Sequence, residues 1–177
     1  MFIIRPARHQ EKSVLNALIA RSGIGLSAGF YTDEQAQAIT RDVFGVDSAL
    51  VADGTYYAIE EEGVVVACGG WSKRATDFGG DHAKSGNERP LDPATEPARI
   101  RAFFVDPGMA RRGLASMLLV HCTTQARMAG FSALELVSTM PGEPLYLRYG
   151  FVPIEKIKLA LSGGVTVALT RMRKEIG

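Results

Sequence analysis

The sequence predicts one domain of the α/β (α+β) class over residues 1–177, with about seven strands and about four helices. Hydrophobic residues make up 46% of the chain, which is enough for one substantial core. Short strand-like apolar runs alternate with longer segments whose apolar residues recur at helical spacing. We find no repeat, low-complexity tract or linker that would divide the chain.

The first half of the sequence predicts three strands and two helices. Pro6 ends the first strand, and Ser22-Gly23 is expected to end the first helix. Thr32 and Gln35 form a capping box at the start of the second helix. In order, we expect a strand over 1–5, helices over 10–21 and 32–44, and a hairpin of strands over 55–60 and 64–71.

The second half has a more regular pattern. Asp106-Pro107-Gly108 is a turn between a strand and a strongly apolar helix, and Gly130 and Gly150 end two helices. In order, we expect a strand over 99–105, a helix over 113–129, a strand over 134–138, a helix over 143–149, and strands over 151–157 and 165–171.

A long loop over 73–96 separates the two halves. It is rich in Gly, Pro, Asp and Asn and has no periodicity. Long loops inside compact domains are uncommon and often functional. The segment is therefore either a lid over a site or a tolerated surface insertion.

Composition excludes several classes of function. The net charge of +1 argues against a dedicated nucleic-acid binder, and the 22–31 connection is too long for a helix-turn-helix. Cys68 and Cys122 lack the spacing of a metal site or a disulfide framework, so we expect two buried thiols and no metal. No signal peptide or membrane-spanning run is recognisable. We expect a soluble, cytoplasmic protein without membrane or nucleic-acid partners.

The segment from Phe103 to Ala115 is a strand, a turn and a helix start. A helix N-terminus presents free backbone N–H groups and a positive dipole end, which together bind phosphate. Gly113 leaves the backbone open there, and Arg111 and Arg112 add positive charge. The alternative is an ordinary turn with two solvated arginines. An NTPase is disfavoured because the Lys and Ser/Thr of a P-loop are missing.

The segment 110–115, Ala-Arg-Arg-Gly-Leu-Ala, resembles the Gln/Arg-x-x-Gly-x-Gly/Ala motif of the GCN5-related N-acetyltransferase (GNAT) family. It matches at Gly113 and Ala115 and departs at Ala110. The segment 145–151, Leu-Tyr-Leu-Arg-Tyr-Gly-Phe, resembles the family's Phe-Tyr-x-x-x-Gly-Phe run, and the order of elements agrees over nearly the whole chain. The resemblance implies the GNAT fold, a central mixed and mostly antiparallel sheet of about seven strands flanked by about four helices.

The resemblance also implies roles for individual residues. Backbone groups of Phe103 and Val105 bind the acyl carbonyl and the pantetheine arm, and the amides of 111–116 hold the pyrophosphate. Thr139 stands where many relatives carry an Asn that contacts the cofactor arm. Tyr146 stands where relatives keep the tyrosine that protonates the leaving thiolate. The full set expected at acetyl-CoA is Phe103, Phe104, Val105, Ala110, Arg111, Arg112, Gly113, Leu114, Ala115, Ser116 and Thr139.

The activity implied is an acetyl-CoA-dependent N-acetyltransferase. It would transfer acetyl to a primary amine of a small molecule or peptide by direct attack in a ternary complex. The alternative is a non-catalytic acyl-CoA-binding sensor or interaction module. A homodimer is an expectation from the family alone.

The general base is left open by the sequence. Many relatives carry a Glu near the position of Arg99, and an arginine cannot serve as a base. The candidates are Glu96, Asp92, Glu143 or a water held by backbone carbonyls.

Two interpretations also remain open for the residues that we expect near the acceptor. Alternation places Arg99, Arg101 and Phe103 on one strand face, where the arginines either bind an anionic group of the acceptor or pair with acidic residues. Four aromatic residues either wall the acceptor site or pack in the core: Phe30, Tyr31, Trp71 and Phe78.

Overall fold

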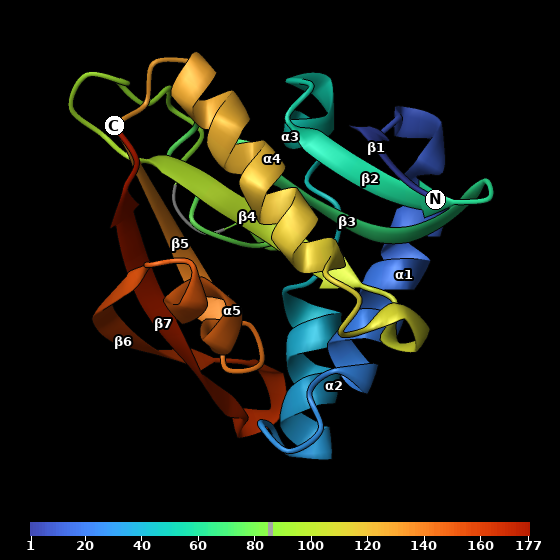
Figure 1. Ribbon diagram of the computed structural model, residues 1–177. Helices are drawn as coiled ribbons and strands as arrows, with labels where there is room; N and C mark the ends of the chain where they lie inside the picture. Colours follow the sequence, from blue (N-terminus) through green and yellow to red (C-terminus); the bar gives the residue numbers. More distant parts are fainter. Residues whose placement is uncertain (85–86) are drawn as a thin grey trace.

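A sheet in the order β1-β2-β3-β4-β5-β7-β6 runs through the molecule (Figure 1). The computed structural model describes residues 1–84 and 87–177. Every neighbouring pair of strands is antiparallel except β4 and β5, which are parallel. The strands are β1 (Phe2–Pro6), β2 (Tyr56–Glu61), β3 (Val64–Ser72), β4 (Ala98–Val105), β5 (Ala133–Thr139), β6 (Val152–Ala160) and β7 (Thr166–Glu175).

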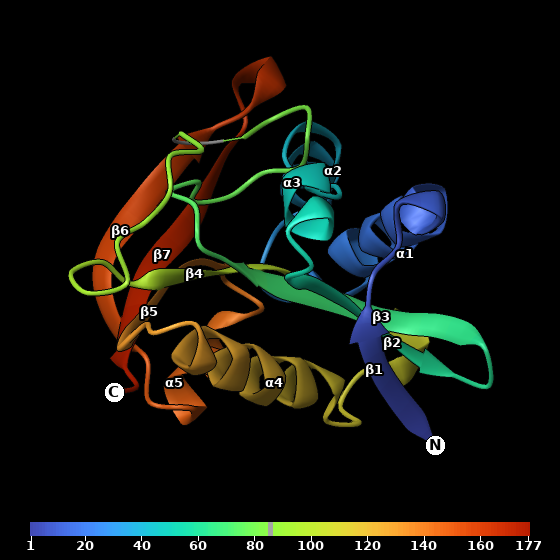
Figure 2. The same ribbon diagram turned by 90° about the horizontal axis from the view of Figure 1, so that it is seen from above.

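Helices cover both faces of this sheet. Seen from above, α1, α2 and α3 lie on one face and α4 and α5 on the other (Figure 2). Each face has its own hydrophobic core, since buried side chains of α4 and of α1 fall into separate clusters. The helices are α1 (Lys12–Gly25), α2 (Asp33–Asp42), α3 (Ser48–Ala52), α4 (Leu114–Met128) and α5 (Glu143–Arg148).

The predicted mixed sheet with flanking helices is confirmed, with two differences among the helices. The helix α1 continues past Ser22-Gly23 to Gly25. A Cβ atom at Gly23 would lie 2.5 Å from Thr40 Oγ1 and 2.8 Å from the Phe44 ring, so this glycine allows close packing rather than ending the helix. The helix α3 was not predicted, because its five residues are too few to show a helical period.

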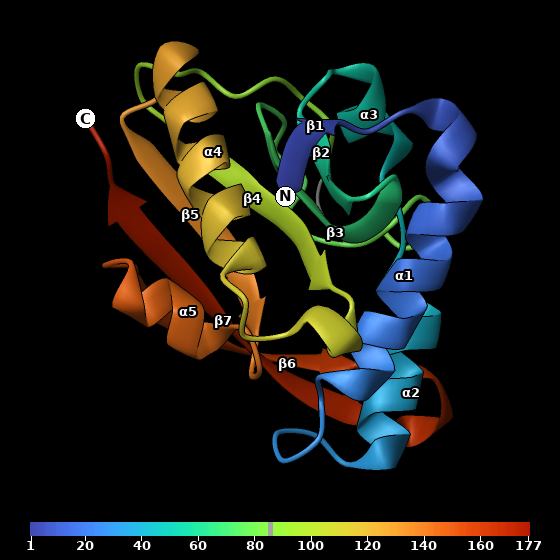
Figure 3. The same ribbon diagram turned by 45° about the vertical axis from the view of Figure 1, so that its right-hand side comes forward.

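The strands β4 and β5 diverge soon after they pair. Their only paired residues in the described chain are Ala98 with Leu134 and Arg99 with Glu135. Beyond that point β4 leads toward α1, whereas β5 stays beside β7 (Figure 3). Beyond these two pairs, the edge of β4 that faces β5 has no strand partner among the described residues. Its backbone groups therefore face the space between the two strands.

A bulge interrupts β4 at the same place. The pairing of β3 with β4 shifts register between Cys68 and Gly70, and Ala102 has a φ of 55°. An extra residue in one strand moves the following side chains to the other face. Phe103 accordingly packs on the α4 face, whereas Arg101 bonds Asp47 at the start of α3. The prediction that Phe103 shares a face with Arg99 and Arg101 is therefore wrong.

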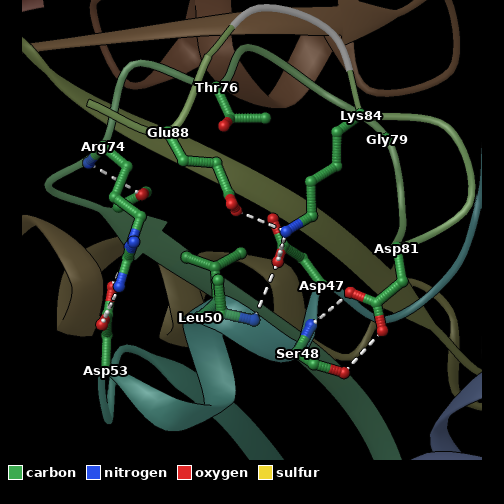
Figure 4. Close-up of polar contacts among 12 residues, drawn as sticks. Asp47, Ser48, Leu50, Asp53, Arg74, Thr76, Gly79, Asp81, Lys84 and Glu88 are labelled. Atoms are coloured by element: carbon green, nitrogen blue, oxygen red, sulfur yellow. Dashed lines mark hydrogen bonds and ion pairs between the residues drawn. The ribbon is translucent and has the colours of Figure 1, made fainter. Parts of the chain in front are cut away.

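The predicted loop 73–96 is fixed at both its base and its tip, and its residues 85 and 86 lie outside the described residues. At its base the Leu91 N–H donates to the Lys73 carbonyl at 2.8 Å. At its tip the Asp81 carboxylate accepts from the Ser48 N–H at 2.8 Å (Figure 4). The same carboxylate contacts Lys12 at 2.7 Å. These contacts hold the loop against α3 and α1.

Candidate active site

A cleft of about 610 Å³ opens where β4 and β5 diverge. Its walls come from the end of α1, the connection after it, the loop segment 77–80, β4, the start of α4, the end of β5, and α5. Segments from both halves of the chain therefore meet around one cavity. Its size suits a small ligand site.

One end of the cleft is the N-terminus of α4. Within the described chain, the backbone N–H groups of 111–116 have no hydrogen-bond acceptor. Arg111 has a φ of 64° and Gly113 a φ of 81°, so left-handed residues alternate in this turn. Successive N–H groups in such a turn form a concavity that binds anions. A Cβ atom at Gly113 would meet nothing within 4 Å, which leaves open space beside the amides.

The two arginines of this turn differ in position. Arg111 lines the cleft, as do Ala110 and Ala115. The Arg112 guanidinium instead lies 4.9 Å from the centre of the Phe2 ring and 3.7 Å from Glu61. Of the two arginines, only Arg111 therefore lines the cleft.

The free edge of β4 forms the middle of the cleft. Phe103, Phe104 and Val105 all line it. The Val105 N–H already donates to the hydroxyl of Ser22 at 3.2 Å. A ligand that uses this N–H must displace Ser22, a residue that the sequence indicated only as a helix end.

Tyr146 lies on α5 at the far wall of the cleft. Its ring packs against Phe151 at 5.7 Å and Phe103 at 6.3 Å between centroids, and 8% of the residue is exposed. Burial raises the pKa of Tyr146 well above its ordinary value. The hydroxyl thus keeps its proton through the neutral range and can donate it.

Comparison with known proteins identifies the family. Residues 26–151 match the model of the acetyltransferase (GNAT) family. The chain belongs to this family. A search of curated proteins finds no match.

Three similar solved structures show the GNAT fold at low sequence identity. A GCN5-related N-acetyltransferase from Rhodopseudomonas palustris shares 19% identity at a TM-score of 0.71, over 98% of this chain and 94% of that one. The PaiA N-acetyltransferase from Thermoplasma acidophilum, in complex with coenzyme A, shares 11% at 0.64, over 99% of each chain. A GNAT family acetyltransferase from Brucella melitensis, in complex with acetyl-CoA, shares 16% at 0.57, over 100% and 89%.

The aromatic residues predicted for the acceptor side divide between the cleft and the core. Phe30 and Tyr31 line the cleft, and the Tyr31 hydroxyl donates to the Ala168 carbonyl at 2.6 Å and accepts from the Met140 N–H at 3.0 Å. Trp71 instead packs in the core of the α4 face, 6.0 Å from the Phe131 ring. The interpretation of Trp71 as a wall of the acceptor site is therefore wrong, because its side chain faces α4.

The remaining predicted residues divide between the cleft and other contacts. Thr139 and Arg101 line the cleft. Arg99 contacts Asp77 at 3.3 Å and the Pro97 carbonyl at 2.8 Å. The amides of Leu114 and Ser116 belong to the free group at the start of α4.

Asp77 is the only carboxylate on the cleft lining within the described residues. Arg99 contacts it at 3.3 Å and Arg171 at 3.2 Å. Sequence reasoning missed Asp77, since a residue in an aperiodic loop carries no signal of its partners. Of the candidate bases, Glu96 pairs with Arg89, and Glu143 accepts from Thr170 at 3.2 Å.

Among the described residues, no three His, Cys, Asp or Glu side chains are grouped to hold a metal ion. None of the described helices combines the length and the apolar character needed to cross a membrane.

Proposed function

We propose that this chain is an N-acetyltransferase that transfers an acetyl group from acetyl-CoA to a primary amine of a small molecule or peptide. The amine attacks the thioester directly while both substrates occupy the cleft. The observation that carries the proposal is the set of free amides at the start of α4, which opens onto the same cleft as the buried Tyr146 hydroxyl. Two of the similar structures are complexes with coenzyme A or acetyl-CoA.

The residues fit such a cofactor. The amides of 111–116 and the Arg111 side chain supply positive potential for a pyrophosphate, and the open space at Gly113 admits it. The free edge of β4 supplies backbone groups for the pantetheine arm. Bound acetyl-CoA supplies the activated acyl group.

The chain's own groups then act on protons and charge. A fixed N–H on β4, that of Phe103, stabilises charge on the acyl oxygen without reorganisation. Tyr146 gives its proton to the departing sulfur. The amine must be neutral to attack, and at pH 7 about 1 in 2,500 lysine-type amines is neutral, against roughly a tenth of α-amines.

A binding module without turnover is the second candidate. It is favoured by Asp77, because two arginines already hold the one carboxylate on the described lining. For the catalytic candidate, a desolvating cleft must keep the amine neutral, or a water held by backbone carbonyls must accept its proton.

Release of free thiol from acetyl-CoA distinguishes the acetyltransferase from the binding module. A panel of primary amines is added to the protein with acetyl-CoA, and each product is confirmed by mass. Amine-dependent thiol release is the expected result. Tight binding of acetyl-CoA without release for any amine would contradict the catalytic proposal and favour the binding module.

A further inference from the structure

Arg101 is a charged side chain buried in the wall of the cleft. Only 2% of its side chain is exposed. Its Nη2 atom donates to Asp47 Oδ2 at 3.2 Å and to the Gly79 carbonyl at 2.9 Å. Its Nη1 atom is buried and finds no acceptor among the described residues. A buried charged donor without an acceptor is costly, and such groups are usually completed by a water, an ion or a ligand.

The charges around Arg101 leave part of its own charge uncompensated. Asp47, whose side chain is 3% exposed, contacts both Arg101 at 3.2 Å and Lys84 at 3.0 Å. Figure 4 shows Lys84 between Asp47 and Glu88. Lys84 also contacts Glu88, whose charge is screened because its side chain is 45% exposed. Asp77 is engaged by two other arginines. Arg101 therefore favours an anion in this part of the cleft.

Several other residues that line the cleft are apolar. Phe30, Phe44 and Phe78 line it, as do glycines 45, 79 and 80, and the Gly79 carbonyl accepts a hydrogen bond from Arg101. A ligand in the cleft can therefore meet aromatic rings as well as the arginine.

The distance along β4 limits the size of that ligand. Arg101 and Phe103 are two residues apart, so about 7 Å of backbone at most separates them. The proposed function places the acyl oxygen at the Phe103 N–H. The Arg101 side chain extends from the other face of β4, so an anion at its guanidinium lies beyond this backbone distance by up to the length of the side chain, on the lining of the same cleft.

We infer that the acceptor is a small primary amine with a carboxylate and an apolar body, of the chemical class of an apolar amino acid, and that Arg101 Nη1 binds its carboxylate. This inference rests on the proposed function and names its acceptor class. One free donor suits a carboxylate better than a phosphate, whose three acceptor oxygens and higher charge call for several donors. A peptide N-terminus carries no carboxylate so close to its amine.

The first experiment uses the unaltered protein with acetyl-CoA. Leucine, phenylalanine and methionine are each compared with their carboxamides and with the amines that lack the carboxyl group. The kcat/KM for thiol release is expressed per neutral amine, which removes differences in amine pKa. The acids are expected to exceed their carboxamides by about tenfold to hundredfold, as for a hydrogen bond to a charged group. Equal values, or a preference for the neutral amines, would overturn the inference.

The second experiment assigns the preference to Arg101. Arg101→Gln leaves Asp47 paired with Lys84, whereas the control Lys84→Met leaves Asp47 paired with Arg101. Arg101→Gln is expected to lower kcat/KM for the acids to the level of the carboxamides, and Lys84→Met to keep the preference. Stabilisation by acetyl-CoA in thermal unfolding verifies that each variant is folded.

Two results would count against the assignment in different ways. An acid preference that survives in Arg101→Gln would overturn the role of Arg101. If the protein binds no acetyl-CoA and acetylates no amine, both the proposed function and the inferred acceptor class are contradicted. If it acetylates only amines without a carboxylate, the proposed function stands and only the acceptor class is overturned.

Discussion

Burial sets the protonation state of Tyr146. The residue is 8% exposed, and burial raises its pKa. The phenol therefore keeps its proton even at alkaline pH, where more of an acceptor amine is neutral. One side chain can thus act as a proton donor over the pH range in which the nucleophile becomes active.

Replacing Tyr146 by Phe removes the proton and leaves the ring that packs against Phe103 and Phe151. We expect kcat to fall by about a hundredfold or more, as for loss of a general acid. Binding of acetyl-CoA, measured by thermal unfolding, should be unchanged. Unchanged turnover in Tyr146→Phe would contradict the role of Tyr146 as the proton donor.

Gly113 combines a positive φ with open space at the anion end of the cleft. Asn and Asp tolerate a left-handed conformation about equally well and differ mainly in charge. Gly113→Asp should raise the Kd for coenzyme A about tenfold or more, because its carboxylate faces the pyrophosphate. Gly113→Asn is the matched control and should bind much more tightly than Gly113→Asp. Equal affinities of the two variants would mean that the pyrophosphate lies elsewhere.

At the scale of elements, the β4 bulge decides which backbone groups face the cleft. Ala102 holds a φ of 55°, which is unfavourable for a residue with a Cβ. The hydroxyl of the fully buried Tyr56 donates to the Ala102 carbonyl at 2.8 Å. This hydrogen bond fixes the bulge and, with it, the orientation of Phe103.

Tyr56→Phe removes that hydrogen bond without changing the packed ring. We expect a loss of about 1–2 kcal/mol in the free energy of unfolding, or roughly 2–8 °C in the midpoint, because a buried carbonyl loses its donor. The kcat/KM for acetyl-CoA should fall as well. Tyr57→Phe, on the same strand and against His121, is the control and should leave kcat/KM unchanged. Parallel behaviour of the two variants would argue against a role for the bulge.

The loop 73–96 is held to α3 by an ionised carboxylate. Burial disfavours the charge of Asp81, but hydrogen bonds from Lys12 and Ser48 outweigh it and lower the pKa to about 2. The ordinary pKa of an Asp is about 3.9, so the stabilisation is present above that value and disappears as pH falls toward the folded pKa.

Asp81→Asn removes this charge at every pH. At pH 7 we expect the variant to unfold about 1–2 kcal/mol more easily than the unaltered protein, because it loses a charge-assisted contact. The difference should shrink as pH falls from about 5 toward 2. Thermal unfolding of both proteins across this range measures it, and a difference that is independent of pH would refute the assignment to the ionised carboxylate.

At the scale of the whole molecule, the cleft exists because the sheet divides. The strands β4 and β5 pair over two residues each and then diverge, with helices on both faces. The gap between them runs from the free amides of α4 to the aromatic wall near α1 and α2. Both ends belong to one cavity.

The sequence predicted the elements around this cleft closely. The strand β4 and the helix α4 begin at Ala98 and Leu114, each one residue from its predicted start, because their apolar patterns are strong. The face of Phe103 was misjudged because counting alternate residues does not reveal a bulge.

Contacts between distant parts of the chain could not be predicted from the sequence either. Ser22 and Val105 are separated by 83 positions, and Asp77 and Arg171 by 94. No local pattern encodes such pairs. Tyr146, Arg101 and the turn at Gly113 were found from motifs or strand position, and their partners only from the fold.

Thermal unfolding with and without acetyl-CoA tests the central claim most directly. Ligand at about 100 times its Kd should stabilise the protein by about 2.7 kcal/mol. For a chain of this length that raises the unfolding midpoint by roughly 5–10 °C. The account predicts this shift with acetyl-CoA and none with ATP or NAD. No shift at millimolar acetyl-CoA would contradict the assignment of the cleft to coenzyme A.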